Sequence, residues 1–155
     1  MRSWFLLYHS PKAYQQILAG FDRLSVTHYT PKLTVITKRA DSKTSVRISK
    51  RPLFPAYLFV YFDPEVVHTT KITQLIGVNE FVKIGGQVRP LPETIIDGLR
   101  NLELAKVDQS DQSVSYSNVP DDLMAKLEEI NGQSEPVNRM ASLINFLDGY
   151  VRNAH

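Results

Sequence analysis

The stretch RPLFPAYLFVYFDP at residues 51–64 decides the fold of this chain. Its first two prolines fix an extended backbone that leads into an uninterrupted hydrophobic run. Because side chains alternate across a strand, every second residue of this run shares a face. One face carries Tyr57, Phe59 and Tyr61, and the other carries Leu58, Val60 and Phe62. Both faces are apolar, which predicts a central strand covered on both sides, or one whose second face binds a partner.

Alternating strand and helix patterns surround this central strand. Hydrophobic alternation and turn residues predict further strands at residues 4–8, 26–37, 44–48 and 80–84, with 88–91 pairing back. The strand at 26–37 is interrupted at Thr30-Pro31. Three- and four-residue spacing predicts helices at 11–24, at 68–76 and from Pro92 onward, with Ser10 as a cap and Gly77 as a stop. The order of elements predicts an α+β fold.

The pattern changes after about residue 104. Residues 105–118 are polar and aperiodic, which indicates a linker. Two amphipathic helices joined by a tight turn at Asn131-Gly132 are expected within residues 119–153. Ser134 is expected to cap the second helix, which follows a near-heptad spacing from Val137 to Val151. We therefore divide the chain into a domain at 1–104, a linker at 105–118 and a helical hairpin at 119–153.

Length and charge narrow the class of protein. The 155 residues suit one domain with a modest appendage, which excludes large multi-domain enzymes. The net charge of +2 hides an asymmetry: residues 1–100 hold 14 Lys/Arg against 7 Asp/Glu, and residues 101–155 hold 4 against 9. The first part is therefore +7 and the second −5. This split suggests an anionic partner for the basic part and internal masking by the acidic part.

Residue types that carry catalysis are sparse and scattered. There is no cysteine, the four histidines are dispersed, and Gly85-Gly86 lacks the residues of a phosphate-binding loop. Asp63 and Glu65 flank Pro64, a pattern more typical of a turn than of paired catalytic carboxylates. We expect no enzyme activity, no metal and no cofactor. Without a signal-peptide run or a span of about 20 apolar residues, we expect a soluble cytoplasmic protein with no membrane partner.

A basic hairpin follows the second strand. Six cations fall between residues 38 and 51 against a single acid, Asp41. They are Lys38, Arg39, Lys43, Arg47, Lys50 and Arg51. Such a cluster suits contact with nucleic-acid phosphates, although a solvated hairpin that only improves solubility explains the composition equally well.

Three segments resemble a known family in order and spacing. WFLLY at 4–8, PLFPAYLFV at 52–60 and Gly77-Val78-x-x-Phe81-Val82 resemble the N-terminal (NGN) domain of NusG-type transcription elongation factors, over about residues 1–100. DPEVVHTT at 63–70 resembles the specialised RfaH-like branch. The resemblance implies a ferredoxin-like antiparallel sheet flanked by helices, in a bacterial cytoplasmic protein associated with the nucleoid through RNA polymerase.

The resemblance also implies contacts with two polymerase subunits. An apolar depression would bind the clamp helices of the β′ subunit through Leu6, Tyr57, Phe59, Ile84, Ile96 and Leu99. The same six residues also suit an ordinary core. The gate loop of the β subunit would bind His68, Thr69 and Thr70, of which Thr69 or Thr70 also suits a helix N-cap. A protein that bridges both subunits would hold the clamp closed and suppress pausing.

Contact with non-template or upstream DNA is implied for the basic surface. The candidate residues are Trp4, Tyr8, Lys12, Arg23, Lys38, Arg39, Lys43, Arg47 and Lys71. The chain departs from the RfaH-like branch at Lys71, Thr73 and Ile76, where that branch carries polar and basic readers of DNA. Because Ile76 offers no hydrogen bond, this departure argues against recruitment by the same sequence element.

The C-terminal part departs further from the family. The family's second domain is usually a small KOW β-barrel, and residues 101–155 lack its pattern. In RfaH-like proteins a helical hairpin covers the polymerase-binding depression at rest. We therefore expect an autoinhibitory lid that does not refold to a barrel. Its apolar residues are Leu123, Leu127, Ile130, Met140, Ile144 and Leu147. Two other roles stay open: a dimer seam, or a docking site for another protein.

Three functional readings follow from these patterns. The first is a polymerase-bound elongation or antitermination factor. The second is a stand-alone RRM-like protein whose aromatic residues on the 57–61 face stack on nucleic-acid bases. The third is a regulator that competes with NusG at the clamp.

Overall fold

Four strands form the central sheet of the computed structural model, which describes residues 1–38, 46–107 and 118–153. They are β1 (Ser3–His9), β2 (Thr27–Tyr29), β5 (Tyr57–Phe62) and β6 (Val78–Phe81). The spatial order is β2-β5-β1-β6, and every neighbouring pair is antiparallel. This order, with one helix after β1 and another after β5, is that of the ferredoxin-like fold. The predicted α+β class and the central position of the 57–62 strand are confirmed.

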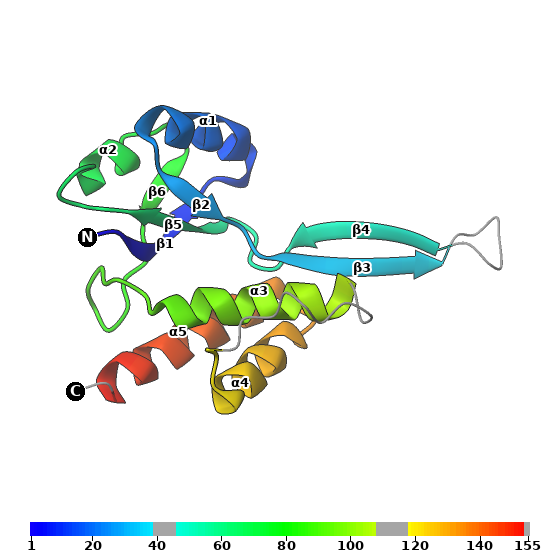
Figure 1. Ribbon diagram of the computed structural model, residues 1–155. Helices are drawn as coiled ribbons and strands as arrows, with labels where there is room; N and C mark the ends of the chain where they lie inside the picture. The colour runs from blue at the N-terminus through cyan, green and yellow to red at the C-terminus, as the bar shows by residue number, and fades with distance from the viewer. Residues whose placement is uncertain (39–45, 108–117, 154–155) are drawn as a thin grey trace.

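Helices cover both faces of the sheet (Figure 1). On one face lie α1 (Tyr14–Leu24), preceded by a 3-10 turn at Pro11–Ala13, and α2 (Thr69–Thr73). On the other face lies α3 (Glu93–Val107). The alternation along β5 divides its side chains between two cores: Leu58, Val60 and Phe62 pack under α1 and α2, and Phe59 packs toward α3. Helices therefore cover both apolar faces predicted for this strand, although Tyr57 and Tyr61 near its two ends are only half-buried.

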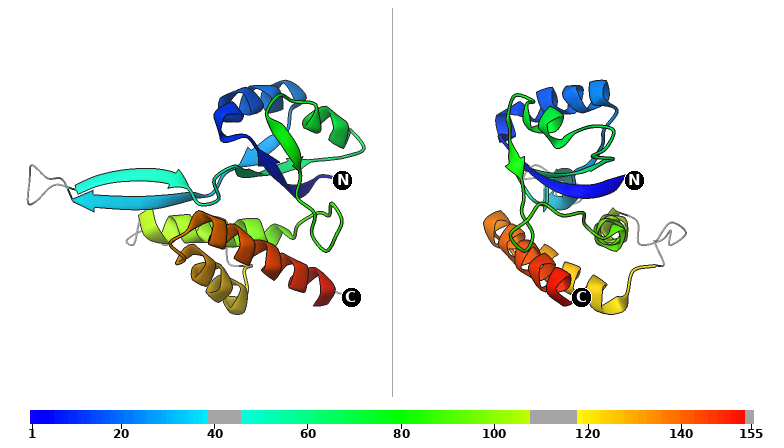
Figure 2. Two further views of the ribbon diagram at one scale, coloured as in Figure 1. Left: turned by 180° about the vertical axis from the view of Figure 1, so that it is seen from behind. Right: turned by 90° about the vertical axis from the view of Figure 1, so that its left-hand side faces the viewer.

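The segment predicted as one strand at 26–37 splits into two at Pro31. The first half, β2, stays in the sheet, and the second half, β3 (Lys32–Lys38), pairs only with β4 (Val46–Pro52). Proline has no N–H to donate, and the carbonyl of Pro31 accepts a hydrogen bond from the N–H of Leu53 at 2.9 Å, which fixes the point of departure. The resulting ribbon extends away from the body (Figures 1 and 2).

The return strand of this ribbon is longer than predicted. It was expected at 44–48, but β4 continues to Pro52, which pairs with Lys32. The polar run at 49–51 shows little alternation of hydrophobicity, because α3 contacts the ribbon along β3 and leaves most of β4 exposed. The predicted tip at 38–43 lies, apart from the backbone of Lys38, outside the described residues.

Two further helices, α4 (Asp121–Asn131) and α5 (Pro136–Asn153), form the expected C-terminal hairpin. α3 runs to Val107, beyond residue 104 where the linker was expected to begin, because no proline or glycine stops it. Residues 108–117 lie outside the described part of the chain. The second helix of the hairpin begins at Pro136, one residue later than a cap at Ser134 predicts, in agreement with the preference of proline for the first helical turn.

The α2 region differs in detail from its prediction. The helix ends at Thr73, before Leu75-Ile76, and its N-cap is His68 rather than Thr69 or Thr70. The N–H of Thr70 donates to His68 Nδ1 at 3.2 Å, so the imidazole takes the role expected of a hydroxyl. Ser10, expected to cap the first helix, makes no side-chain cap hydrogen bond. The strand predicted at 80–84 lies earlier in the sequence, at Val78–Phe81. Of the segment expected to pair back at 88–91, Leu91 pairs with Trp4 through an isolated bridge.

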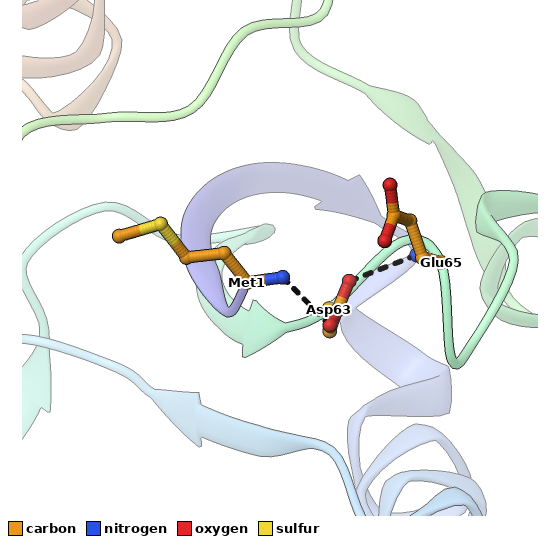
Figure 3. A network of polar contacts seen from close by, with 3 residues as sticks. All are labelled: Met1, Asp63 and Glu65. Atoms are coloured by element: carbon orange, nitrogen blue, oxygen red, sulfur yellow. Dashed lines mark hydrogen bonds and ion pairs between the residues drawn. The ribbon is translucent and has the colours of Figure 1, made fainter.

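Asp63 closes the turn after β5 (Figure 3). Its carboxylate accepts a hydrogen bond from the Met1 amino group at 2.7 Å and another from the N–H of Glu65 at 2.9 Å. The bond to the amino group, followed by the one to Glu65, lowers the pKa of Asp63. Asp63 therefore acts as a turn-former, as the sequence pattern indicated.

Gly77 is expected to be the glycine most sensitive to substitution. Its φ is +94°, and a Cβ built there would lie 2.1 Å from Ala13 Cβ. Gly77→Ala should therefore destabilise the chain by about 2–5 kcal/mol, the sum of left-handed strain and a clash with the start of the first helix. Gly86→Ala is the matched control because the φ of Gly86 is +84° and no neighbouring atom lies within 4 Å of a Cβ built there. This variant should lose only about 1–2 kcal/mol of stability, from left-handed strain alone. Urea unfolding of both variants measures the difference, and equal losses would contradict the clash.

Candidate binding site beneath the C-terminal helices

The six residues predicted to bind a partner gather on the α3 side of the sheet. Leu6 comes from β1, Phe59 from β5, and the others from β5, the turn after β6, and α3. We call this set the apolar face: Leu6, Tyr57, Phe59, Ile84, Ile96 and Leu99. Five of the six side chains are fully buried and Tyr57 is half-buried, all in one cluster. The structure therefore brings together residues separated by up to 93 positions in the sequence.

The C-terminal helices bury this face. Their apolar side chains belong to the same cluster as the apolar face, so one continuous core joins the two parts of the chain. Of the six predicted lid residues, five are buried and Ile144 is half-buried: Leu123, Leu127, Ile130, Met140, Ile144 and Leu147. In both views of Figure 2, α4 and α5 lie on the side of the molecule opposite α1 and α2. We refer to α4 and α5 together as the lid.

The lid packs against the domain at Gly98 of α3. A Cβ at this position would lie 2.4 Å from Leu127 Cδ1, so a larger residue there would have to displace this leucine side chain. Nearby, Asn101 Nδ2 donates to Met124 Sδ at 3.8 Å. The sequence offered no signal for this contact, because a single glycine within a helical pattern has several explanations.

Two polar contacts fix the ends of the lid. The N–H of Gly85, in the turn after β6, donates to Asp148 Oδ1 of α5 at 2.6 Å. Asn118 Nδ2, just before α4, donates to Asp97 Oδ2 of α3 at 3.2 Å. Asp97 is buried and also lies 3.6 Å from Arg100 Nη1. These contacts orient the helices, whereas most of the contact is apolar.

The burial of Val137 and Leu143 differs from what the heptad pattern predicted. Val137 was expected in the apolar seam but is 79% exposed, and Leu143 is fully buried. The buried stripe of α5 runs through positions 140, 143 and 147, which leaves Val137 outside it. The three- and four-residue spacing of this stripe could have revealed Leu143.

The aromatic residues at the sheet end of the apolar face differ in their exposure. Trp4, predicted to contact DNA, is only 5% exposed; the Arg100 guanidinium lies 5.6 Å from its ring centroid. Tyr8 is exposed and its ring lies 5.0 Å from that of Tyr57. Burial, followed by the neighbouring Tyr8 and Glu80, raises the pKa of Tyr57. Tyr8 is therefore accessible to a ligand in this state, and Trp4 is not.

The predicted gate-loop residues lie together at the start of α2. His68 and Thr70 are exposed, Thr69 is half-buried, and His68 Nδ1 lies 2.9 Å from Thr70 Oγ1. This small polar group is on the opposite side of the sheet from the lid (Figure 1), so the lid leaves it uncovered.

The predicted DNA-binding cations fall on two elements of the structure. Lys12, Arg23 and Lys71 are exposed near α1 and α2, where Arg23 lines a hollow of about 460 Å³ together with the exposed Ile76. Arg47, Lys50 and Arg51 are exposed on β4, where alternation places Lys50 on the opposite face from the two arginines. Arg39 and Lys43 lie outside the described residues, as does the side chain of Lys38.

Neutralising the ribbon is expected to weaken binding to duplex DNA and to flatten its salt dependence. The triple change Arg47→Gln, Lys50→Gln and Arg51→Gln removes three exposed cations. If each contacts a phosphate, the slope of log K against log salt should fall in magnitude by about 3, at roughly 0.9 for each contact. Titration of a labelled duplex at several salt concentrations measures the slope. Lys126→Gln on α4 is the control, and an equal slope in both variants would contradict a role of the ribbon.

Comparison with known proteins places the chain in a family. The family model described as "Transcription termination factor nusG" matches residues 2–100. The chain belongs to the NusG family. It is thus a member of a family of transcription factors, and the matched region ends within α3, before the lid.

A solved structure described as "Domain interaction in Thermotoga maritima NusG" is similar to this NusG-family chain, with a TM-score of 0.41 and 18% sequence identity. The match covers 72% of this chain and 62% of that chain, so this protein spans less than two thirds of the length of that NusG.

Across residues 1–38, 46–107 and 118–153, no group of three or more His, Cys, Asp or Glu side chains is placed to hold a metal ion. Within the same ranges, no helix has the length and apolar character needed to cross a membrane.

Proposed function

We propose that this chain is a transcription elongation and antitermination factor that binds RNA polymerase through the apolar face. The partner of that face would be the clamp helices of the β′ subunit, and His68, Thr69 and Thr70 would bind the gate loop of the β subunit. The observation that carries the proposal is the convergence of the six predicted residues on one surface of the sheet and α3. Membership of the NusG family supports a role in transcription.

The mechanism follows from where the two contact sites lie. They are on opposite sides of the sheet, so a single rigid domain can hold two parts of polymerase at once. A factor that binds only the closed clamp shifts the population of polymerase toward that state, by as much as its affinities for the closed and open states differ. Pausing and termination, which need an opened clamp, would then be suppressed.

The lid would regulate this activity. Polymerase and the lid would compete for the apolar face, because Leu127, Met140 and Leu147 share its cluster. The apparent affinity for polymerase is then the intrinsic affinity multiplied by the fraction of molecules whose lid is open. We infer that the closed chain is an autoinhibited form, in preference to a dimer seam, since the apolar side of the lid is already buried within one chain.

The decisive experiment measures binding of core RNA polymerase to residues 1–107 and to the full chain. The truncated chain should bind more tightly, and Tyr57→Asp should abolish its binding, because an unpaired carboxylate would enter an apolar interface. Ile48→Asp is the matched control, since Ile48 is exposed on the ribbon and away from the apolar face. Undiminished binding of a folded Tyr57→Asp variant would exclude the proposal.

The same experiment separates the alternatives. A stand-alone RRM-like protein would bind single-stranded RNA without polymerase, and Tyr57→Asp would weaken that binding instead. A competitor of NusG would bind polymerase through the same face but would not reduce pausing in a transcription assay.

A further inference from the structure

A pocket lies at the seam between the domain and the lid. Pro55 and Tyr57, at the start of β5, form one wall. The first three turns of α5 form the other wall, through Pro136, Val137, Met140, Ala141 and Ile144. The pocket has a volume of about 330 Å³. It opens to solvent beside Val137, the residue that the heptad pattern placed in the seam but that is 79% exposed.

The chemistry of the walls defines what the pocket can hold. None of the seven lining side chains is charged, and Tyr57 alone carries a hydroxyl. A charged ligand would lose its hydration without gaining a partner, so the pocket favours a neutral molecule. An apolar cavity of about 150 Å³ binds benzene, and a pocket of roughly twice that volume therefore suits a fused or substituted ring. Binding would be driven by removal of the apolar surface of Val137 and Ile144 from water.

We propose that this pocket binds a small neutral aromatic molecule of one or two rings, and that such a ligand holds the lid closed. The second part follows from the position of the walls. One wall belongs to the domain and the other to α5, so the complete pocket exists only while the lid is seated. A ligand that binds one state alone raises the population of that state. The ligand would therefore act as a negative regulator of whatever binds the apolar face.

The regulatory consequence rests on the proposed function, but binding and lid closure do not. Tyr57 belongs both to the pocket and to the apolar face. A ligand in the pocket would therefore oppose a partner in two ways, by stabilising the lid and by occupying one edge of the partner's own site.

Binding is tested with indole and 2-naphthol as probes on the full chain. Methyl NMR should show saturable shifts at Val137, Met140 and Ile144, and unchanged signals at Ile72 in the opposite core. Ala141→Phe should fill the pocket and abolish these shifts. Asn145→Phe adds the same ring to an exposed position of α5 and should leave them intact. Shifts that are absent, or that persist in a folded Ala141→Phe variant, would overturn the proposal.

Lid closure is tested separately, by thiol labelling. The chain has no cysteine, so Leu99→Cys introduces one thiol beneath the lid. Its rate of reaction with a maleimide reports lid opening. At a probe concentration 100 times its Kd, the rate should fall about 100-fold. An unchanged or faster rate would refute closure by the ligand, whatever the outcome with polymerase. If labelling slows as expected but polymerase does not bind even the truncated chain, the proposed function fails and this inference stands.

Discussion

Leu127→Asp is expected to release the lid and to raise the affinity of the full chain for RNA polymerase by about 100-fold or more. Leu127 is fully buried, and its Cδ1 lies against Gly98 of α3. Loss of a buried leucine costs about 2–5 kcal/mol, and an unpaired carboxylate in its place adds to that cost. At 1.4 kcal/mol for each factor of ten, the ratio of closed to open molecules should fall by about a thousandfold.

The measurement is a titration of fluorescent core polymerase with each chain. Ala125→Asp, at an exposed position of the same helix, adds the same charge without entering the core and should leave the affinity unchanged. NMR of the Ile72 and Val60 methyls, in the core under α1 and α2, verifies that the domain remains folded. A released lid with no gain in affinity would show that α4 and α5 do not inhibit polymerase binding.

The sheet and its two cores could be predicted because they follow local patterns. Alternation along residues 57–62 assigned each side chain of β5 to its core, and the spacing of Ile17 and Phe21 assigned α1 to one face. The ribbon could not be assigned in the same way. Helix α3 covers the ribbon only on the β3 side, and β4 stays largely exposed. The sequence of β4 therefore carries no alternation beyond Ile48, and its length is set by pairing with β3.

The candidate site was predicted in its members but not in its contacts. The resemblance supplied the six residues of the apolar face, and helical spacing supplied the lid residues. No local pattern encodes how the lid packs on the domain. That packing determines the contact at Gly98, the hydrogen bond accepted by Asp148 and the exposure of Val137. Trp4 was predicted to contact DNA but is only 5% exposed, because a family position indicates a residue's type and not its exposure in this structure.

The structure also changes the meaning of the charge asymmetry. The opposite charges of the two parts suggested electrostatic masking of the basic part. The acids of α4 instead face solvent: Asp121, Asp122, Glu128 and Glu129 are exposed. Within the described residues, the ion pair of α4 is internal, between Lys126 and Glu129 at 3.5 Å. Burial of the apolar face is therefore apolar in origin, and closure of the lid should depend little on salt, in contrast to the DNA binding predicted for the ribbon.

A covalent link between the lid and α3 is expected to have the second of the two largest effects on polymerase affinity. It should lower this affinity, whereas Leu127→Asp should raise it. Asn101→Cys with Met124→Cys places thiols on facing positions of α3 and α4, where the native side chains lie 3.8 Å apart. A short bis-methanethiosulfonate reagent would join them. The native chain has no cysteine, so no other position reacts.

The locked chain should lose polymerase binding by at least about 100-fold, because a covalent link removes the open state on which binding depends. Reduction cleaves the link and should restore the original affinity in the same sample, which excludes damage to the fold as the cause. The single variant Asn101→Cys, treated with the same reagent, is the control for modification of α3. If the locked chain binds as well as the reduced one, polymerase does not need the surface beneath α4, and the apolar face is a structural core. The lock and Leu127→Asp move one equilibrium in opposite directions, so together they establish whether polymerase and the lid share that face.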